Sequence, residues 1–174
     1  LEGERAVLSA HPGALVLRTT MHGWTAQGRR SFSETILRGL VRGERLTLFS
    51  DVRFSPLVVT DHAALIKRLD GQSGVLNLGA ADAVTKEAFG RMVARAFDLS
   101  DASIEGITLG SLGLPAPRPR NTALDVARLA RTLGSAPPTV AAGVRALRDG
   151  MVAAARLKGR DASSVRDLVE DPAS

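Results

Sequence analysis

Two short, continuous apolar runs constrain the fold of this chain most strongly. Residues 14–18 read ALVLR and follow a helix-like segment, and residues 74–79 read GVLNLG. Strands buried on both faces of a parallel sheet read as continuous apolar runs, whereas strands with one wet face alternate apolar and polar residues. Segments with helical periodicity separate these runs, so strands alternate with helices along the chain. The sequence therefore predicts an α/β protein with at least two buried parallel strands.

Capping residues support this alternation. The segment SFSETILRGLVRG (31–43) opens on serines near Glu34 and closes on Gly43, which is typical of a capped helix. The expected N-terminal cap residues of three helices are Ser31 or Ser33, Thr60 or Asp61, and Thr85. Because only two or three strands are predicted in 174 residues, we expect more sheet on the N-terminal side.

Composition excludes several kinds of chemistry. The chain contains no cysteine and no tyrosine, so it has no thiolate nucleophile, no disulfide and no tyrosine acid or base. Its three histidines have no second ligand at metal-site spacing, so no metal site is expected. The net charge of +5 is spread among acidic residues, which does not favour nucleic-acid binding. With no membrane-length apolar run, no membrane contact is expected, and the chain is interpreted as cytoplasmic.

Candidate ligand contacts follow the first apolar run. His22 lies in the loop after it, and ligands of parallel sheets bind beyond the carboxyl ends of the strands. The alternative for His22 is a solvent-facing loop histidine. Arg118 and Arg120 flank Pro119 in an extended stretch, where a guanidinium could grip a phosphate or remain solvated. No glycine-rich phosphate loop and no pairing of nucleophile with base can be assembled from the sequence.

Four segments, in this order, resemble one family. ALVLRTTMHGW (14–24) resembles a strand and loop of extended short-chain dehydrogenase/reductases, in the branch of the dTDP-4-dehydrorhamnose reductases. SFSETILRGLVRGERLTLFSDVRFSPLVVTDHA (31–63) resembles the next part of that branch, which includes its D-x-x-x-S-P-x-x-V-x-D-x-A signature. GVLNLGAADAVTKEAFGRMVARAF (74–97) and RPRNTALDVARLARTLG (118–134) resemble later parts of the same branch. The resemblance implies the C-terminal part of a Rossmann-like parallel sheet with a mostly helical substrate-binding subdomain. Residues 1–158 would form this substrate-binding portion, and residues 159–174 a polar C-terminal tail.

The same resemblance gives the opening residues a meaning. In that branch, a Tyr-x-x-x-Lys pair is followed at once by an x-x-G-E helix segment, and LEGE (1–4) resembles that segment. The dinucleotide-binding half and the catalytic Tyr and Lys would then lie upstream, so no residue of this chain is expected to be catalytic. The family reduces 4-keto-6-deoxy sugar nucleotides with NADPH or NADH. NAD(P)H is therefore expected in the full-length protein, whereas the isolated chain is expected to be inactive and to bind no cofactor tightly.

Site residues are carried over from the resemblance position by position. Those implied to line the nicotinamide and sugar side of the cleft are Thr19, Thr20, Met21 and His22. Those implied to contact the sugar nucleotide are Ser31, Phe32, Phe54, Ser55, Pro56, Arg118 and Asn121. The implied partners are the sugar-nucleotide substrate and the N-terminal half, with a second copy of the chain as a candidate partner in a homodimer.

One departure from the family keeps a second function open. Met21 stands where many members of the branch carry tryptophan, and Trp24 falls later in the loop. The regulatory subunit of methionine adenosyltransferase also resembles this branch and acts by binding a partner enzyme. The alternative to a reductase is therefore a non-catalytic regulatory or binding subunit of the same fold.

Overall fold

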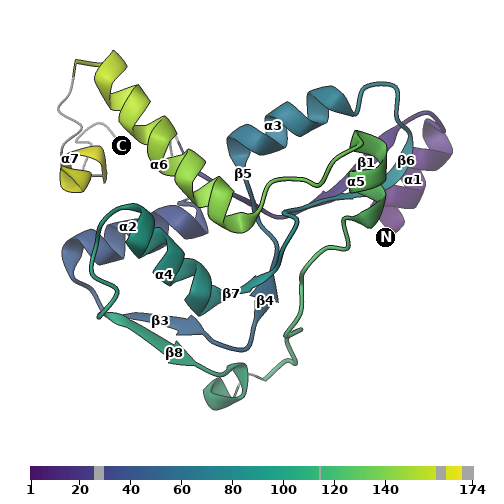
Figure 1. Cartoon of the computed structure of the whole chain (residues 1–174). Helices are drawn as coiled ribbons and strands as arrows, with labels where there is room; N and C mark the ends of the chain where they lie inside the picture. Colours follow the sequence, from purple (N-terminus) through teal and green to yellow (C-terminus); the bar gives the residue numbers. More distant parts are fainter. Residues whose placement is uncertain (26–29, 114, 160–163, 170–174) are drawn as a thin grey trace.

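The computed structural model describes residues 1–25, 30–113, 115–159 and 164–169, in which strands alternate with helices (Figure 1). The helices are α1 (Glu2–Ala10), α2 (Phe32–Arg42), α3 (Val59–Arg68), α4 (Lys86–Ala96), the short 3-10 helix η1 (Leu109–Leu112), α5 (Ala127–Leu133), α6 (Val140–Leu157) and α7 (Val165–Val169). The strands are β1 (Leu15–Thr19), β2 (Met21–His22), β3 (Leu46–Phe49), β4 (Arg53–Phe54), β5 (Leu57–Val58), β6 (Gly74–Leu78), β7 (Val84–Thr85) and β8 (Ile104–Ile107). The predicted α/β class is confirmed.

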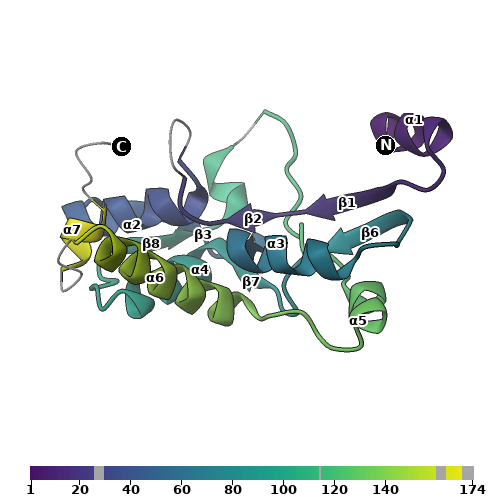
Figure 2. The same ribbon diagram turned by 90° about the horizontal axis from the view of Figure 1, so that it is seen from above.

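The two apolar runs form the parallel pair β1–β6. Along this pair, Thr19 of β1 lies opposite Leu78 of β6. α5 runs beside the outer edge of β6 (Figure 2), where Arg128 donates to the Val75 carbonyl oxygen at 3.0 Å. Within the described ranges, β1 pairs with no strand other than β6. The outer edge of β1 is therefore the open side of this pair.

The main core lies among the helices α2, α4 and α6. α4 packs on both other helices and also covers the parallel pair formed by β3 and β8. The most deeply buried side chains of this region are Ile36, Leu37, Leu57, Phe89, Val93, Phe97, Val140 and Val144. Burial of one such side chain contributes roughly 1.5–3 kcal/mol relative to exposure. This region forms the mostly helical subdomain expected beside the sheet.

Local signals place two helices where capping predicts them. The Ser31 hydroxyl accepts from the Glu34 N–H at 3.2 Å, and the Thr85 hydroxyl accepts from the Ala88 N–H at 3.1 Å. Gly43 ends α2 in a left-handed conformation with φ 68°, which glycine adopts without the steric cost of a Cβ. The predicted boundaries of α2 and the predicted start of α4 are confirmed.

Two expectations drawn from the local pattern fail. The predicted cap of α3 is wrong, because Val58 precedes the helix rather than Thr60 or Asp61. β5 runs directly into α3, so the pairing of β5 with β2 sets this boundary instead of a side-chain cap. Leu15 and Leu17 of β1 are only half-buried, although their continuous apolar run predicts burial on both faces.

The C-terminal residues also contribute to the core. α7 lies against α2 and α6, and its Leu168 and Val169 side chains are buried. Part of the segment expected to be a polar tail therefore packs on the rest of the chain, and the boundary at residue 158 stays a prediction. None of the described helices is long and apolar enough to cross a lipid bilayer.

Candidate functional site

Ser55 joins three segments at the carboxyl ends of β1 and β6. It is only 1% exposed, and its hydroxyl accepts from the Leu124 N–H at 2.9 Å. The Ser55 carbonyl oxygen accepts from the Ala80 N–H at 3.0 Å and from the Thr20 hydroxyl at 3.3 Å. A Cβ added at Gly79 would lie 3.1 Å from the Ser55 hydroxyl oxygen, so glycine allows this close approach. Residues after β1, residues after β6 and the segment before α5 thus meet at one point, here called the Ser55 junction.

The segment before α5 is held beside β4. The Arg53 N–H donates to the Arg120 carbonyl oxygen at 2.7 Å, and the Thr122 N–H donates to the Arg53 carbonyl oxygen at 2.9 Å. This pairing places Asn121 opposite Arg53 and therefore close to the Ser55 junction. Arg118 is exposed, and no described residue forms a hydrogen bond or ion pair with its side chain.

Three phenylalanines and a lysine form a cluster next to this junction. Phe32 of α2, Phe54 of β4 and Phe89 of α4 have ring centroids 5.9, 5.7 and 5.3 Å apart. The Lys86 Nζ lies 3.3 Å from the Phe54 ring centroid and 4.6 Å from the Phe32 ring centroid. Burial disfavours the charged form and lowers the pKa of Lys86 to about 8. The Lys86 ammonium group therefore contacts the rings of both Phe32 and Phe54, two residues implied to contact the sugar nucleotide.

Sequence reasoning missed Lys86 as a site residue. A lysine in the first turn of a helix is usually solvated, so its residue type alone does not mark Lys86 as a site residue. The signal that could have identified it is its position directly after the Thr85 cap, on a helix that carries Phe89. Its contact with Phe54, however, depends on the antiparallel pairing of β4 with β7.

His22 is buried inside the protein rather than exposed at its surface. It is only 2% exposed, its ring meets Phe89 edge-on at 5.2 Å, and a Cβ at Gly143 would lie 3.3 Å from its Nε2. Neither ring nitrogen has a hydrogen-bond partner among the described residues. Burial lowers the pKa of His22 to about 4, so the imidazole is neutral at pH 7. The solvent-facing alternative is therefore wrong, and a role in lining the cleft stays a prediction.

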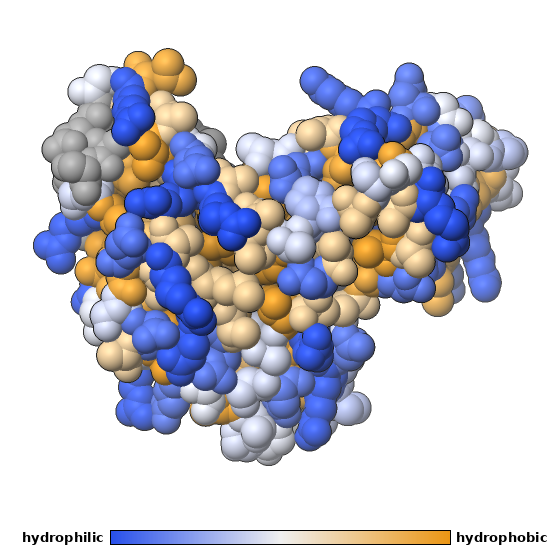
Figure 3. Space-filling view, in the orientation of Figure 1, coloured by the Kyte–Doolittle hydropathy of each residue, from blue (hydrophilic) through white to orange (hydrophobic). Residues whose placement is uncertain are grey.

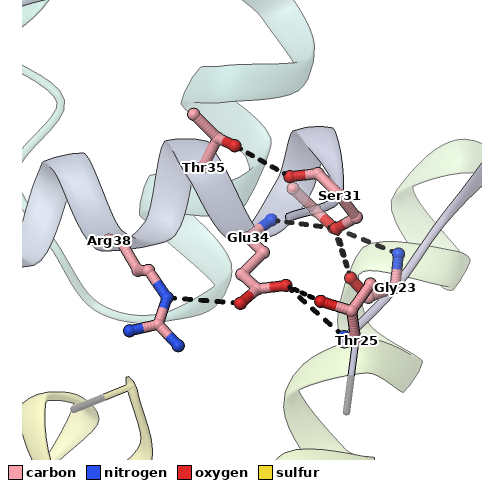
Figure 4. Close-up of polar contacts among 7 residues, drawn as sticks. Gly23, Thr25, Ser31, Glu34, Thr35 and Arg38 are labelled. Atoms are coloured by element: carbon pink, nitrogen blue, oxygen red, sulfur yellow. Dashed lines mark hydrogen bonds and ion pairs between the residues drawn. The ribbon is translucent and has the colours of Figure 1, made fainter. Parts of the chain in front are cut away.

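A polar network ties the loop after β2 to the first turns of α2 (Figure 4). The Ser31 hydroxyl donates to the Gly23 carbonyl oxygen. The Glu34 carboxylate accepts from the Thr25 hydroxyl at 2.6 Å and from Arg38 Nε at 3.2 Å. Because Glu34 and Arg38 are both buried, removal of either would leave an uncompensated charge. The Ser31 hydroxyl, implied to contact substrate, is thus engaged in fixing this loop.

An apolar cavity of about 320 Å³ opens between α6, the start of α3 and Trp24. Figure 3 shows the molecule hollowed between the α6 side and the α3 side, with apolar residues in the hollow. The cavity is lined by Trp24, Val58, Val59, Thr60, Ala146, Leu147, Gly150, Met151, Ala154, Ala155, Lys158 and Leu168. None of the residues implied to bind substrate or cofactor is among them.

The structure brings part of the implied site together. Contacts at the Ser55 junction and in the aromatic cluster connect Thr20, Phe32, Phe54, Ser55 and Asn121. The other six implied residues are not part of these contacts. The Thr19 hydroxyl is buried without a partner among the described residues, Pro56 and His22 are buried, and the Ser31 hydroxyl bonds to Gly23. Met21 is 53% exposed, and Arg118 is also exposed. In the part of the chain that the structure describes, no three His, Asp or Glu side chains gather closely enough to hold a metal ion.

Two curated proteins resemble much of this chain. A probable low-salt glycan biosynthesis reductase of Haloferax volcanii is 31% identical over 153 residues, which cover 84% of this chain and 51% of that protein. A probable dTDP-4,6-dihydroxy-2-methyloxan-3-one 4-ketoreductase of Streptomyces antibioticus is 32% identical over 127 residues, which cover 71% of this chain and 42% of that protein. The chain thus spans about half the length of these relatives.

Solved structures show that the fold is shared. The dTDP-4-dehydrorhamnose reductase of Bacillus anthracis, solved in complex with NADP, superposes with a TM-score of 0.74 at 18% identity. The match covers 85% of this chain and 52% of that protein. The RmlD substrate binding domain family matches residues 1–152, which is most of the sequence. The chain belongs to the RmlD substrate binding domain family.

Proposed function

We propose that the chain is the substrate-binding portion of an NAD(P)-dependent reductase of 4-keto-6-deoxy sugar nucleotides. The observation that carries the proposal is the Ser55 junction, where the carboxyl ends of β1 and β6 meet the segment before α5. Ligands of open parallel sheets bind beyond the carboxyl ends of the strands. Family membership and the reductases named among the relatives support this class of reaction.

The last residue of β1 and the residues that follow it fit a nicotinamide cofactor. The Thr19 hydroxyl is buried without a partner among the described residues, so a carboxamide at this place would satisfy it. Thr20 and the exposed Met21 would line the same side, and the buried His22 ring would keep β2 packed against α4. When bound, NAD(P)H supplies the hydride, and the role of these residues is to orient the cofactor and exclude water.

The proposed partner is a dinucleotide-binding half that adds a strand to the outer edge of β1. The outer edge of β6 is closed by α5 and the residues just before it, since Arg128 donates to the Val75 carbonyl and Asn77 donates to the Asp125 carbonyl. Among the described residues, β1 pairs with no strand other than β6, and α1 contacts it through the Glu4–Arg18 ion pair. Because the sequence contains no tyrosine, the proton donor for the reduced carbonyl would come from that half.

The proposal is tested by following NADPH oxidation with dTDP-4-dehydrorhamnose. We expect no turnover by the 174-residue chain and measurable turnover by a chimera that joins it to the dinucleotide-binding half of the Haloferax relative. Turnover by the isolated chain would contradict the proposed division of labour. A chimera that folds and binds NADPH but leaves the sugar nucleotide unreduced would count against the substrate class.

A regulatory or binding subunit of the same fold is the second candidate. The apolar cavity beside Trp24 favours it, because this cavity lies apart from the implied substrate residues and Leu157 at the end of α6 is 90% exposed. Exposed apolar surface of this kind is typical of protein-binding sites. A stable complex with another enzyme that survives Trp24→Ala would argue against this site, whereas loss of the complex would support it.

A further inference from the structure

We propose that Lys86, held over the rings of Phe32 and Phe54, forms a binding subsite for a diphosphate group. The subsite is inferred from the position and surroundings of the cation. Only the source of the diphosphate, a sugar nucleotide, rests on the proposed function.

The backbone of Lys86 is fixed on both sides. Lys86 is the first residue of α4, and the preceding Thr85 caps that helix and pairs with Arg53 of β4. The Lys86 N–H donates to the Val52 carbonyl oxygen at 3.0 Å. The side chain therefore starts from a rigid point and reaches the Phe54 ring, where its Nζ lies 3.3 Å from the centroid.

No described residue neutralises this cation. Within the described ranges, the Lys86 Nζ forms no hydrogen bond and no ion pair, and its polar contacts are the faces of two rings. The acidic residues on the neighbouring elements are engaged elsewhere. Glu34 pairs with Arg38, Asp51 pairs with Arg120, and Glu87 pairs with Arg91. The Asp82 carboxylate, just before β7, accepts from the Val140 N–H at 2.7 Å.

An ammonium group in this state is prepared to bind an anion. Ring faces attract a cation, but they leave its N–H donors available for charge-assisted hydrogen bonds to oxygen. Part of the hydration of Lys86 is already lost, so an arriving anion displaces less water than it would at an exposed lysine. The lowered pKa of Lys86 agrees with a cation that lacks compensating negative charge.

The position of the cation indicates which anion it would bind. Phe54 precedes Ser55, so the cation lies next to the junction where the strand ends meet. The diphosphate is the anionic group of a sugar nucleotide, and lysine binds phosphate oxygens as a compact point charge. The dinucleotide cofactor also contains a diphosphate, so the experiment must separate these two sources.

Lysine NMR tests the subsite directly, because the chain has only three lysines. In protein labelled with ¹³C at lysine Cε, the Lys86 signal should titrate near pH 8. Saturation with pyrophosphate should raise that midpoint by about one pH unit, since an adjacent anion favours the charged form. The signals of Lys67 and Lys158 should not respond. A Lys86 midpoint that pyrophosphate leaves unchanged would overturn the proposal.

Calorimetry with matched variants measures the contribution of the charge to affinity. Lys86→Met keeps an apolar chain over the rings and should weaken dTDP binding about tenfold, while Lys86→Arg should retain most of it. Thymidine, which lacks phosphate, should bind wild type and Lys86→Met alike. Lys67→Met, on the exposed face of α3, is the control and should match wild type. Equal dTDP affinity for wild type and a folded Lys86→Met chain would overturn the subsite.

Parallel titrations with dTDP and NADP⁺ identify the source of the diphosphate. Dependence of dTDP affinity on Lys86 supports the sugar nucleotide, whereas dependence of NADP⁺ affinity alone would show that the subsite serves the cofactor. The outcome is also separable from the proposed reaction. Lys86-dependent dTDP binding by a chimera without reductase activity would retain the subsite and reject the reaction.

Discussion

The strand pair β1–β6 and the region enclosed by α2, α4 and α6 differ in how much core each contains. In the helical region, side chains such as Phe89 and Phe97 are completely buried. In the strand pair, Leu15 and Leu17 of β1 are half-buried, and no residue of α1 is buried. The difference indicates that the helical region carries most of the folding free energy. The half-exposed leucines of β1, by contrast, fit the proposal that a dinucleotide-binding half extends the sheet beside this strand.

Phe89 in the helical region and Leu17 in β1 allow a direct test of this difference in packing. Phe89→Ala should lower the free energy of unfolding by about 3–5 kcal/mol, because it removes a fully buried ring in contact with Phe32, Phe54 and His22. Leu17→Ala in β1 should cost less than about 2 kcal/mol because the side chain is already half-exposed. Urea denaturation followed by circular dichroism measures both. Equal losses would show that the strand pair is as well packed as the helical region.

The second prediction concerns how the stability of the same core depends on pH. Because the pKa of His22 falls from 6.5 to about 4 on folding, the folded chain binds fewer protons than the unfolded chain between these values. This difference contributes about 3 kcal/mol to the free energy of unfolding above pH 6.5, and the contribution is lost as the pH falls to about 4. His22→Leu should remove this part of the pH dependence, whereas His11→Gln, at an exposed position, should not. Identical pH profiles of wild type and His22→Leu would contradict the buried, neutral imidazole.

A smaller effect is expected at the boundary between the two regions. Ser55→Ala removes the acceptor of the Leu124 N–H and should cost about 1 kcal/mol, because a partly buried donor is left without a partner. Hydrogen exchange should show faster exchange of the Leu124 amide, with the core amides of α4 unchanged. If the Leu124 amide stays protected, the Ser55 junction does not depend on this hydrogen bond.

The smallest effect is expected where α1 meets β1. Arg18 and Glu4 form an ion pair at 2.7 Å, but both side chains are solvent-accessible, so salt and water screen the interaction. Arg18→Met should leave the melting temperature almost unchanged, and high salt should not alter this result. A marked loss of stability would mean that α1 is held more firmly than its lack of buried residues indicates.

Local signals in the sequence predict much of this fold. The Ser31 and Thr85 hydroxyls each accept a hydrogen bond from the N–H three residues later, so their capping roles can be derived from the sequence alone. The apolar runs identify β1 and β6 as parallel strands for a similar reason. The start of α3 at Val59 could not be derived in this way, because it depends on β5 pairing with a strand more than thirty residues away.

The candidate site is less predictable because its geometry is almost entirely non-local. The resemblance supplies Phe32, Phe54 and Asn121 as site residues, and the structure places them around the Ser55 junction. It could not show that His22 points into the core or that Lys86 lies over Phe54. Both facts depend on how α4 packs against elements that are distant in the sequence.

We propose that this chain holds the substrate side of a site and that a dinucleotide-binding half supplies the cofactor side. Calorimetric titration of the isolated chain with dTDP and with NADPH tests this division between the two halves. We predict that dTDP binds measurably and that NADPH does not bind tightly, because within the described residues β1 pairs only with β6, whereas dinucleotide sites lie at the ends of a larger parallel sheet. Tight binding of NADPH by the isolated chain, or no binding of dTDP, would contradict the account.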